Sequence, residues 1–414
     1  MNLLFFVFCF LNLYGPLTTN LTFAFNVLLF LFVYSNRLRF AYERPYIILS
    51  ILLLLLSIVA FANTRDSFKD YSVIGTYLRM LVCCTTFPAI IAFFFRKKTK
   101  ILQILSLTLF LHCLMVLIQM IVPSLQDINT VLFRFQRDAE FLQDFTMRRL
   151  GLTGGYDASG LYAAISVVVS IEIFIMTGNK KYGVISAISL ISSFFTSRTG
   201  MATAFISLFL CVLLNKRSKY VFSGFSFIFI TISAISIFYI ILPLILNSLG
   251  LSTNTGVVET GSNYSSGTKD YLFDYQLLVL EELNTRELIW GYGCGVRNLS
   301  WTFFSSDIGY VKQIFQVGIV GVALIVYFCT LMVIKTYRRN KTIKYNSERK
   351  MGTQILGLLL IIYLVFNYKN HLMYNVCSFE LFLFLYYYLY CLFSSTKTVA
   401  CCNDKRYCRE LRKI

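Results

Sequence analysis

Long apolar stretches recur along most of the chain and are separated by short polar segments. Runs such as 47–62 and 101–122 approach or reach the roughly 20 apolar residues that cross about 30 Å of hydrocarbon. Lipid offers no partner to an unpaired backbone amide or carbonyl, so such stretches must form helices. The pattern therefore predicts an all-α, polytopic transmembrane helix bundle, with residues 1–414 as a single integral membrane domain.

The apolar stretches predict about twelve spans, an even number that returns the chain to its starting side. Hydrophobic residues make up 57% of the chain, which is more apolar surface than a soluble core of this size could bury. The predicted spans cover residues 2–14, 20–36, 46–62, 73–95, 101–122, 159–177, 182–196, 199–214, 220–246, 306–334, 352–367 and 372–394.

The formal net charge is +18, and the position of the cations decides what that charge means. Lysines and arginines cluster in alternate loops and in the tail 395–414, whereas most acidic residues fall in the loops between. Basic loops stay on the cytoplasmic side. We therefore expect both termini in the cytoplasm, contact with anionic membrane lipid as a secondary role, and no nucleic-acid partner. The basic loops span 37–44, 96–100, 180–181, 216–219 and 335–350.

Two predicted external segments, 123–159 and 247–306, are too long to be simple connectors, whose median length is about 4 to 6 residues. The first contains an amphipathic pattern over 131–148, typical of a helix lying along the membrane surface. The second contains a helical pattern over 269–283 and then the glycine-rich stretch 290–295, which we interpret as a close-packed turn. Loops of this length usually carry function, so the site is expected here.

Two arginines are notable for their positions. Arg149 lies in the first long external segment without a local acidic partner, whereas Arg148 can pair with Asp144 one helical turn earlier. Arg198 lies in the turn 196–200 between two predicted spans, where an arginine is costly unless it reaches the interface or serves a site. Helix-start amides beside a guanidinium suit phosphate. Snorkelling of Arg198 to the membrane surface is the alternative explanation.

Four short stretches carry further local patterns. They are Arg149-Leu-Gly-Leu-Thr-Gly-Gly-Tyr-Asp-Ala-Ser-Gly160, Thr196-Ser-Arg-Thr-Gly200, Leu288-Ile-Trp-Gly-Tyr-Gly-Cys-Gly295 and Asp307-Ile-Gly-Tyr-Val-Lys-Gln-Ile-Phe-Gln-Val-Gly-Ile-Val-Gly321. In order and sidedness they resemble the O-antigen polymerase (Wzy) family, whose near neighbours are the O-antigen ligases. The stretch from Arg149 to Gly160 matches the family's arginine-x10-glycine motif, with ten residues between the two. The chain departs from that family in one motif. A second arginine-x10-glycine motif is not met, since Arg297 reaches Gly309 with eleven intervening residues.

The resemblance implies glycosyl transfer at the periplasmic face of the bacterial inner membrane. A growing glycan would leave undecaprenyl pyrophosphate and join a lipid-linked repeat unit, so lipid-linked oligosaccharide and polysaccharide are the implied substrates. A chain-length regulator is the implied protein partner. A guanidinium is permanently charged and forked, which suits departing pyrophosphate. We expect Arg149 and Arg198 to bind it, with Arg148, Arg286 and Arg297 as weaker candidates.

Asp307 is the expected catalytic base or acceptor-orienting group, at the entrance of a late span where the ligases carry a histidine. A helix N-cap is the alternative explanation of this aspartate. Glu172 and Glu380 lie in predicted spans and could face the cavity of the bundle, but we expect each to pair with a neighbouring helix. The sequence has no external D-x-D pair and its two histidines are far apart, so neither a metal nor a cofactor is expected.

Other functions stay open at this point. An O-antigen ligase is the closest enzymatic alternative. A lipid-linked glycan flippase or another transporter can also have about twelve helices and a basic cytoplasmic side, although the two halves of this chain show no matching broken helices. A purely structural membrane scaffold leaves the placement of Arg149 and Arg198 without a reason.

Overall fold

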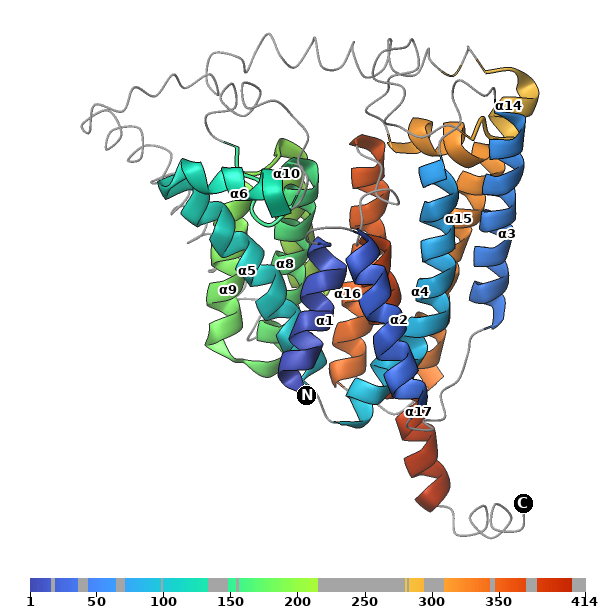
Figure 1. Cartoon of the computed structure of the whole chain (residues 1–414). Helices are drawn as coiled ribbons and strands as arrows, with labels where there is room; N and C mark the ends of the chain where they lie inside the picture. The colour runs from blue at the N-terminus through green and yellow to red at the C-terminus, as the bar shows by residue number, and fades with distance from the viewer. Residues whose placement is uncertain are drawn as a thin grey trace, which may run out of the picture.

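Helices that run back and forth between two ends of one bundle make up the computed structural model (Figure 1). No strand occurs in the described part of the chain. The described residues are 1–15, 19–35, 44–64, 71–97, 100–132, 148–153, 156–214, 280, 283–293, 309–342, 347–369 and 378–403.

The helix bounds follow the apolar stretches of the sequence. The helices are α1 Asn2–Tyr14, α2 Thr19–Ser35, α3 Arg44–Asn63, α4 Tyr71–Arg96, α5 Ile101–Ile121, the 3-10 helix η2 Pro123–Gln126, α6 Asp127–Leu132, α8 Tyr156–Thr177, α9 Lys180–Ser193, α10 Arg198–Leu214, α14 Thr285–Trp290, α15 Gly309–Thr342, α16 Ser347–Lys369 and α17 Ser378–Asn403.

Five of these helices are long and apolar enough to cross a membrane, within the ranges Arg44–Asn63, Tyr71–Arg96, Ile101–Ile121, Ala158–Thr177 and Gly309–Asn340. The all-α prediction is confirmed, and the length and composition of these helices support membrane insertion. Every predicted span except 220–246 has a described helix at its position. The span 220–246 lies outside the described residues, and the total of about twelve stays a prediction.

The long helices alternate in direction from α1 to α10 and again from α15 to α17 (Figure 1). The first residues of α4, α8, α10 and α17 lie at the same end as α14, at the top of Figure 1. The N-terminus, the end of α4 and the start of α9 lie at the opposite end. We name these the outer end and the inner end, because the basic loops predict that the second faces the cytoplasm.

Aromatic side chains join α1, α4 and α17 in the core. The Phe5 ring lies 4.8 Å from the Phe94 ring and 5.6 Å from the Phe384 ring, measured between centroids. All three side chains are buried. The spacing is typical of edge-to-face and tilted aromatic pairs. This cluster fixes the N-terminal helix against the middle of the bundle.

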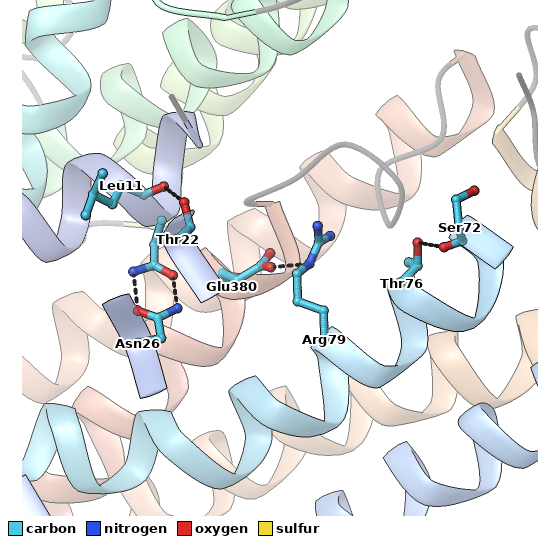
Figure 2. A network of polar contacts seen from close by, with 8 residues as sticks. Leu11, Thr22, Asn26, Ser72, Thr76, Arg79 and Glu380 are labelled. Atoms are coloured by element: carbon cyan, nitrogen blue, oxygen red, sulfur yellow. Dashed lines mark hydrogen bonds and ion pairs between the residues drawn. The ribbon is translucent and has the colours of Figure 1, made fainter. Parts of the chain in front are cut away.

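A reciprocal amide pair joins α1 to α2. The Nδ2 of Asn12 donates to Oδ1 of Asn26 at 3.0 Å, and Nδ2 of Asn26 donates back to Oδ1 of Asn12 at 2.8 Å. The hydroxyl of Thr22 adds a bond to the carbonyl of Leu11 at 3.1 Å (Figure 2). Hydrogen bonds between helices in apolar surroundings contribute about 0.6 kcal/mol each on average. The two asparagines therefore set the register of this hairpin more than its stability.

The glycine-rich stretch after α14 packs against a break in α15. Gly318 has φ 69° and ψ 178°, which interrupts the helix that the sequence predicts as continuous over 306–334. The amides of Tyr292 and Gly293 donate to the carbonyl of Phe315 at 2.7 and 2.9 Å. A Cβ on Gly291 would lie 2.7 Å from the Gly318 amide, so only glycine allows this approach. The predicted close-packed turn is confirmed for residues 291–293.

Candidate functional site

The two arginine-bearing segments that the sequence picks out separately lie against each other at the outer end. The backbone amide of Arg149 donates to the carbonyl of Phe195 at 2.6 Å. Gly160 in α8 faces Gly200 in α10 so closely that a Cβ on Gly160 would lie 2.9 Å from the Gly200 Cα. We call residues 148–153, 159–160 and 194–200 the motif junction. Glycine is required on both sides of this crossing because any side chain would separate the helices.

Buried amides hold the loop of the motif junction in one conformation. The Gly151 amide donates to Oε1 of Gln119 at 2.8 Å, and Nε2 of Gln119 donates back to the Gly151 carbonyl at 3.1 Å. The Nδ2 of Asn129 donates to the carbonyls of Gly151 and Thr153 at 3.0 and 3.1 Å. Both amide side chains are fully buried. The loop backbone is therefore satisfied by α5 and α6 and is not left to find partners in a ligand.

A buried histidine couples this loop to the start of α8. The amide of Leu152 donates to Nδ1 of His112 at 3.0 Å, and Nε2 of His112 lies 3.1 Å from the Ser159 carbonyl. An Nδ1 that accepts a hydrogen bond carries no proton, so the ring is the neutral tautomer with its proton on Nε2. Gly151 has φ +59°, and a Cβ there would lie 2.7 Å from Nδ1. His112 is thus a structural clamp that sequence reasoning did not identify.

The Arg149 side chain is fixed by backbone carbonyls. Its Nε donates to the Gln119 carbonyl at 2.8 Å and its Nη1 donates to the Arg148 carbonyl at 2.9 Å. The residue is 6% exposed. Ser159 donates to the Arg149 carbonyl at 3.2 Å, which ties the same residue to α8. The guanidinium therefore has a set orientation, a property that electrostatic stabilisation of a departing anion requires.

Arg198 is the first residue of α10 rather than a residue of the preceding turn. The difference from the predicted turn has a local cause, because Oγ of Ser197 accepts the Gly200 amide at 3.0 Å and starts the helix one residue earlier. Thr196 and Ser197 are buried. The Arg198 side chain lies outside the described residues, so its interaction with a ligand stays a prediction.

The remaining predicted site residues do not gather in one described place. Arg148 is half-buried beside Arg149 in the motif junction. Arg286 lies in α14 at the other side of the outer end in Figure 1, where its Nη2 donates to Oδ1 of Asn63 at 3.1 Å. Arg297 and Asp307 lie outside the described residues. The structure therefore brings Arg148 and Arg149 next to the start of α10 and holds Arg286 against α3.

A second polar centre lies between α4 and α17. The Nε of Arg79 lies 2.9 Å from Oε1 of Glu380, and their side chains are 19% and 6% exposed (Figure 2). The expected pairing of Glu380 with a neighbouring helix is confirmed. Arg79 was not singled out from the sequence, although an arginine inside the predicted span 73–95 was a usable signal. Glu172 is fully buried in α8, beside Cys211 of α10.

Among the described residues, no group of three or more histidine, cysteine, aspartate or glutamate side chains lies close enough to hold a metal ion. The chemistry that the described residues offer at the outer end is that of fixed cations, hydroxyls and the buried carboxylate of Glu380. A comparison with models of known families gives no match, and a comparison with curated proteins gives none either.

Proposed function

We propose that the protein is a polysaccharide polymerase that transfers a growing glycan from undecaprenyl pyrophosphate onto a lipid-linked repeat unit at the periplasmic face of a bacterial inner membrane. The motif junction is the observation that carries the proposal. Two segments far apart in sequence, each with an arginine suited to phosphate, are joined backbone to backbone through Arg149 and Phe195. A scaffold has no need for that pairing, whereas a pyrophosphate site does.

In this reaction the protein must mainly bind and orient the two substrates, because no covalent bond to the protein is needed. The acceptor hydroxyl attacks the anomeric carbon, the bond from that carbon to pyrophosphate breaks, and the hydroxyl proton passes to a base. The pyrophosphate leaves with the bonding electrons and gains negative charge, so fixed donors around it lower the barrier. A set guanidinium at Arg149 fits this task, since its orientation needs no adjustment during the reaction.

The start of α10 supplies a second element of the proposed anion site. This helix has 17 residues and begins at Arg198, within the motif junction. The positive end of its dipole favours a phosphate group in the same place as a guanidinium. Arg149 and Arg198 are therefore the proposed pyrophosphate ligands, with Arg148 as a neighbouring cation. Asp307 stays the proposed base.

The outward surface of the helices fits substrates that are carried on lipid. The α3 side chains Ile48, Leu52, Leu55 and Val59 are all more than a third exposed, as expected for a surface that faces hydrocarbon. A polyprenyl carrier dissolved in the same bilayer can approach such a surface without leaving the membrane. An O-antigen ligase or a lipid-linked glycan flippase would meet the same requirement, so the test must separate these activities.

The test is the length distribution of surface glycan on a lipopolysaccharide gel after deletion of the gene and complementation. A polymerase predicts that deletion leaves core lipid bearing a single repeat, and that the wild type restores the ladder. Arg149→Ala and Arg198→Ala should fail to restore it at normal protein level, while Arg338→Ala at the inner end should restore it. Loss of even the single repeat would identify a ligase or a flippase, and an unchanged ladder would exclude glycan polymerisation.

A further inference from the structure

A groove between α15 and α16 lies at the inner end of the bundle, and the last residue of α10 completes its wall. Its volume is about 590 Å³, within the range of about 300 to 1,000 Å³ that is usual for ligand sites. Tyr337 of α15 and Ile361 of α16 line the groove and are 52% and 47% exposed, so it is open to the surroundings of the bundle. Nε2 of Gln354 in α16 donates to the Leu214 carbonyl at 3.4 Å, which joins α10 to the same wall.

The lining of the groove changes from polar to apolar with distance from the inner end. α15 ends at Thr342 and α16 begins at Ser347, so the two helices meet at this end. On α15 the lining residues Asn340 and Tyr337 lie nearer to the inner end than Val333. On α16 the lining residues, in order from the inner end, are Lys350, Thr353, Gln354, Gly357, Leu358 and Ile361. A membrane lipid has the same order, with its polar headgroup at the membrane surface and its apolar chains below it.

The length of the groove and the space in it fit one acyl chain. Lys350 and Ile361 are eleven residues apart, so at a rise of about 1.5 Å per residue the lining of α16 extends for about 16 Å. That is about half of the roughly 30 Å of hydrocarbon, which is the thickness of one leaflet. A Cβ added at Gly357, in the middle of this stretch, would meet nothing within 4 Å. The groove therefore has room for a chain of the length that a phospholipid places in one leaflet.

The charge at the inner end favours an anionic headgroup. Residues 335–350 contain seven lysines and arginines but only one acid, Glu348. Lys350 lines the groove, on the same face of α16 as Gln354 and Gly357. It lies in the first turn of α16, where the positive end of the helix dipole also attracts an anion. Three other cations lie over aromatic rings of other helices, in the pairs Lys335 with Tyr46, Arg339 with Tyr390 and Arg349 with Phe393.

We infer that this groove binds an anionic phospholipid from the leaflet at the inner end, with the lipid phosphate at Lys350 and one acyl chain along Gly357 and Ile361. Basic pockets between transmembrane helices on the cytoplasmic side bind headgroups of this kind. The lipid fills the space between α15, α16 and the end of α10, so its binding stabilises the folded protein by mass action. The inference does not depend on the proposed reaction, because the motif junction lies at the other end of α10.

The test is native mass spectrometry of the purified full-length protein in detergent, titrated with phosphatidylglycerol or with phosphatidylcholine of the same acyl chains. The wild type should bind phosphatidylglycerol more tightly. Lys350→Gln should lower the affinity for phosphatidylglycerol about 5-fold, the factor expected for one cation beside an anionic headgroup. Lys181→Gln is the matched control, because Lys181 is exposed at the start of α9 at the same inner end and does not line the groove. It should leave both affinities unchanged.

A second variant tests the apolar part of the groove. Gly357→Leu places a side chain where the acyl chain is inferred to lie, so it should abolish saturable binding of both lipids. Its thermal midpoint without added lipid should stay the same or rise, because leucine favours a helix more than glycine does. Added phosphatidylglycerol should raise the midpoint of the wild type but not of this variant. Gly75→Leu in α4, where an added Cβ also meets nothing within 4 Å, is the matched control and should keep lipid binding.

Other results would overturn the inference. Equal affinities of the wild type for the two lipids, or equal effects of Lys350→Gln and Lys181→Gln, would show that the groove does not select an anionic headgroup. Binding of glycerol phosphate as tight as that of phosphatidylglycerol would show an anion site that takes no acyl chain. A wild type that binds neither lipid would exclude a lipid site. A lower midpoint for Gly357→Leu would then show that another part of the chain, such as the predicted span 220–246, or a second copy occupies the groove.

Discussion

The motif junction and the Arg79–Glu380 pair both join helices at the outer end, but they do so by opposite means. At the junction, glycine lets two helix backbones touch, and the loop is held by amides and a histidine whose partners are mostly backbone groups. Between α4 and α17, the side chains of Arg79 and Glu380 meet in an ion pair, and the Tyr387 hydroxyl donates to the Cys84 carbonyl. The first arrangement depends on residues with special conformations, whereas the second depends on which helices happen to face each other. The first is therefore the harder to replace and the easier to recognise in a sequence.

The largest loss of stability is expected when only one partner of the Arg79–Glu380 ion pair is removed. Arg79→Leu leaves the Glu380 carboxylate buried without its cation, and removal of one partner of a buried pair costs about 3 to 5 kcal/mol of stability. Arg79→Leu combined with Glu380→Leu removes both charges and should recover most of that loss. Thermal unfolding of the four proteins in one detergent measures the coupling. Equal instability of the single and double variants would contradict this account of α4 and α17.

Widening the glycine crossing should have the next largest effect. A Cβ on Gly200 would lie 2.9 Å from the Gly160 carbonyl carbon, so Gly200→Val forces α8 and α10 apart and is expected to cost about 3 kcal/mol. The matched control is Gly75→Ala in α4, where an added Cβ meets nothing within 4 Å. That change should leave stability unchanged or raise it by up to about 1 kcal/mol. Thermal midpoints and glycan ladders report the result, and a tolerant Gly200→Val would mean that the helices do not need this contact.

Replacement of His112 should cause the third largest loss of stability. His112→Phe keeps the ring volume but leaves the Leu152 amide and the Ser159 carbonyl without their partner, at an expected cost of about 2 kcal/mol. The loop that carries Arg149 would also lose its fixed position, so glycan chain length should shorten more than protein level falls. His112→Gln, which can still donate and accept, should recover part of both. Protease sensitivity of the segment around Arg149 offers an independent measurement. No change in either variant would show that His112 does not hold this loop in place.

The smallest effect is expected at the Asn12–Asn26 pair. Asn12→Ala removes two reciprocal hydrogen bonds between α1 and α2, which together are worth about 1 kcal/mol in apolar surroundings. Activity should persist because the hydrogen bonds of Asn12 and Asn26 lie within α1 and α2 and do not involve the motif junction. A loss of the glycan ladder at normal protein level would show that α1 has a role beyond packing.

Apolar stretches were enough to predict the all-α class, because lipid permits no other structure for them. They also placed a described helix at every predicted span except 220–246. The order of the glycine and arginine stretches also led to two segments that do meet. Which side chains meet between helices was harder to predict. A single sequence shows that Arg79 and His112 lie in apolar helices, but not which neighbours they face, since that depends on helix packing. The same limit explains the missed break at Gly318, whose cause is the approach of Gly291 from another segment. Most of 131–148 and 269–283, and all of 220–246, Arg297 and Asp307, lie outside the described residues, so the predictions on them stay predictions.

The turn at residues 291–293 also constrains how the protein is made. The hydroxyl of Thr64 at the end of α3 donates to the carbonyl of Tyr292, a partner 228 residues later in the chain, and the amide of Tyr292 donates to Phe315 in α15. During synthesis α3 enters the membrane long before either partner exists. The outer end therefore closes only after α15 has left the ribosome, so a chain truncated before that helix would reach the membrane with this corner of the bundle unassembled.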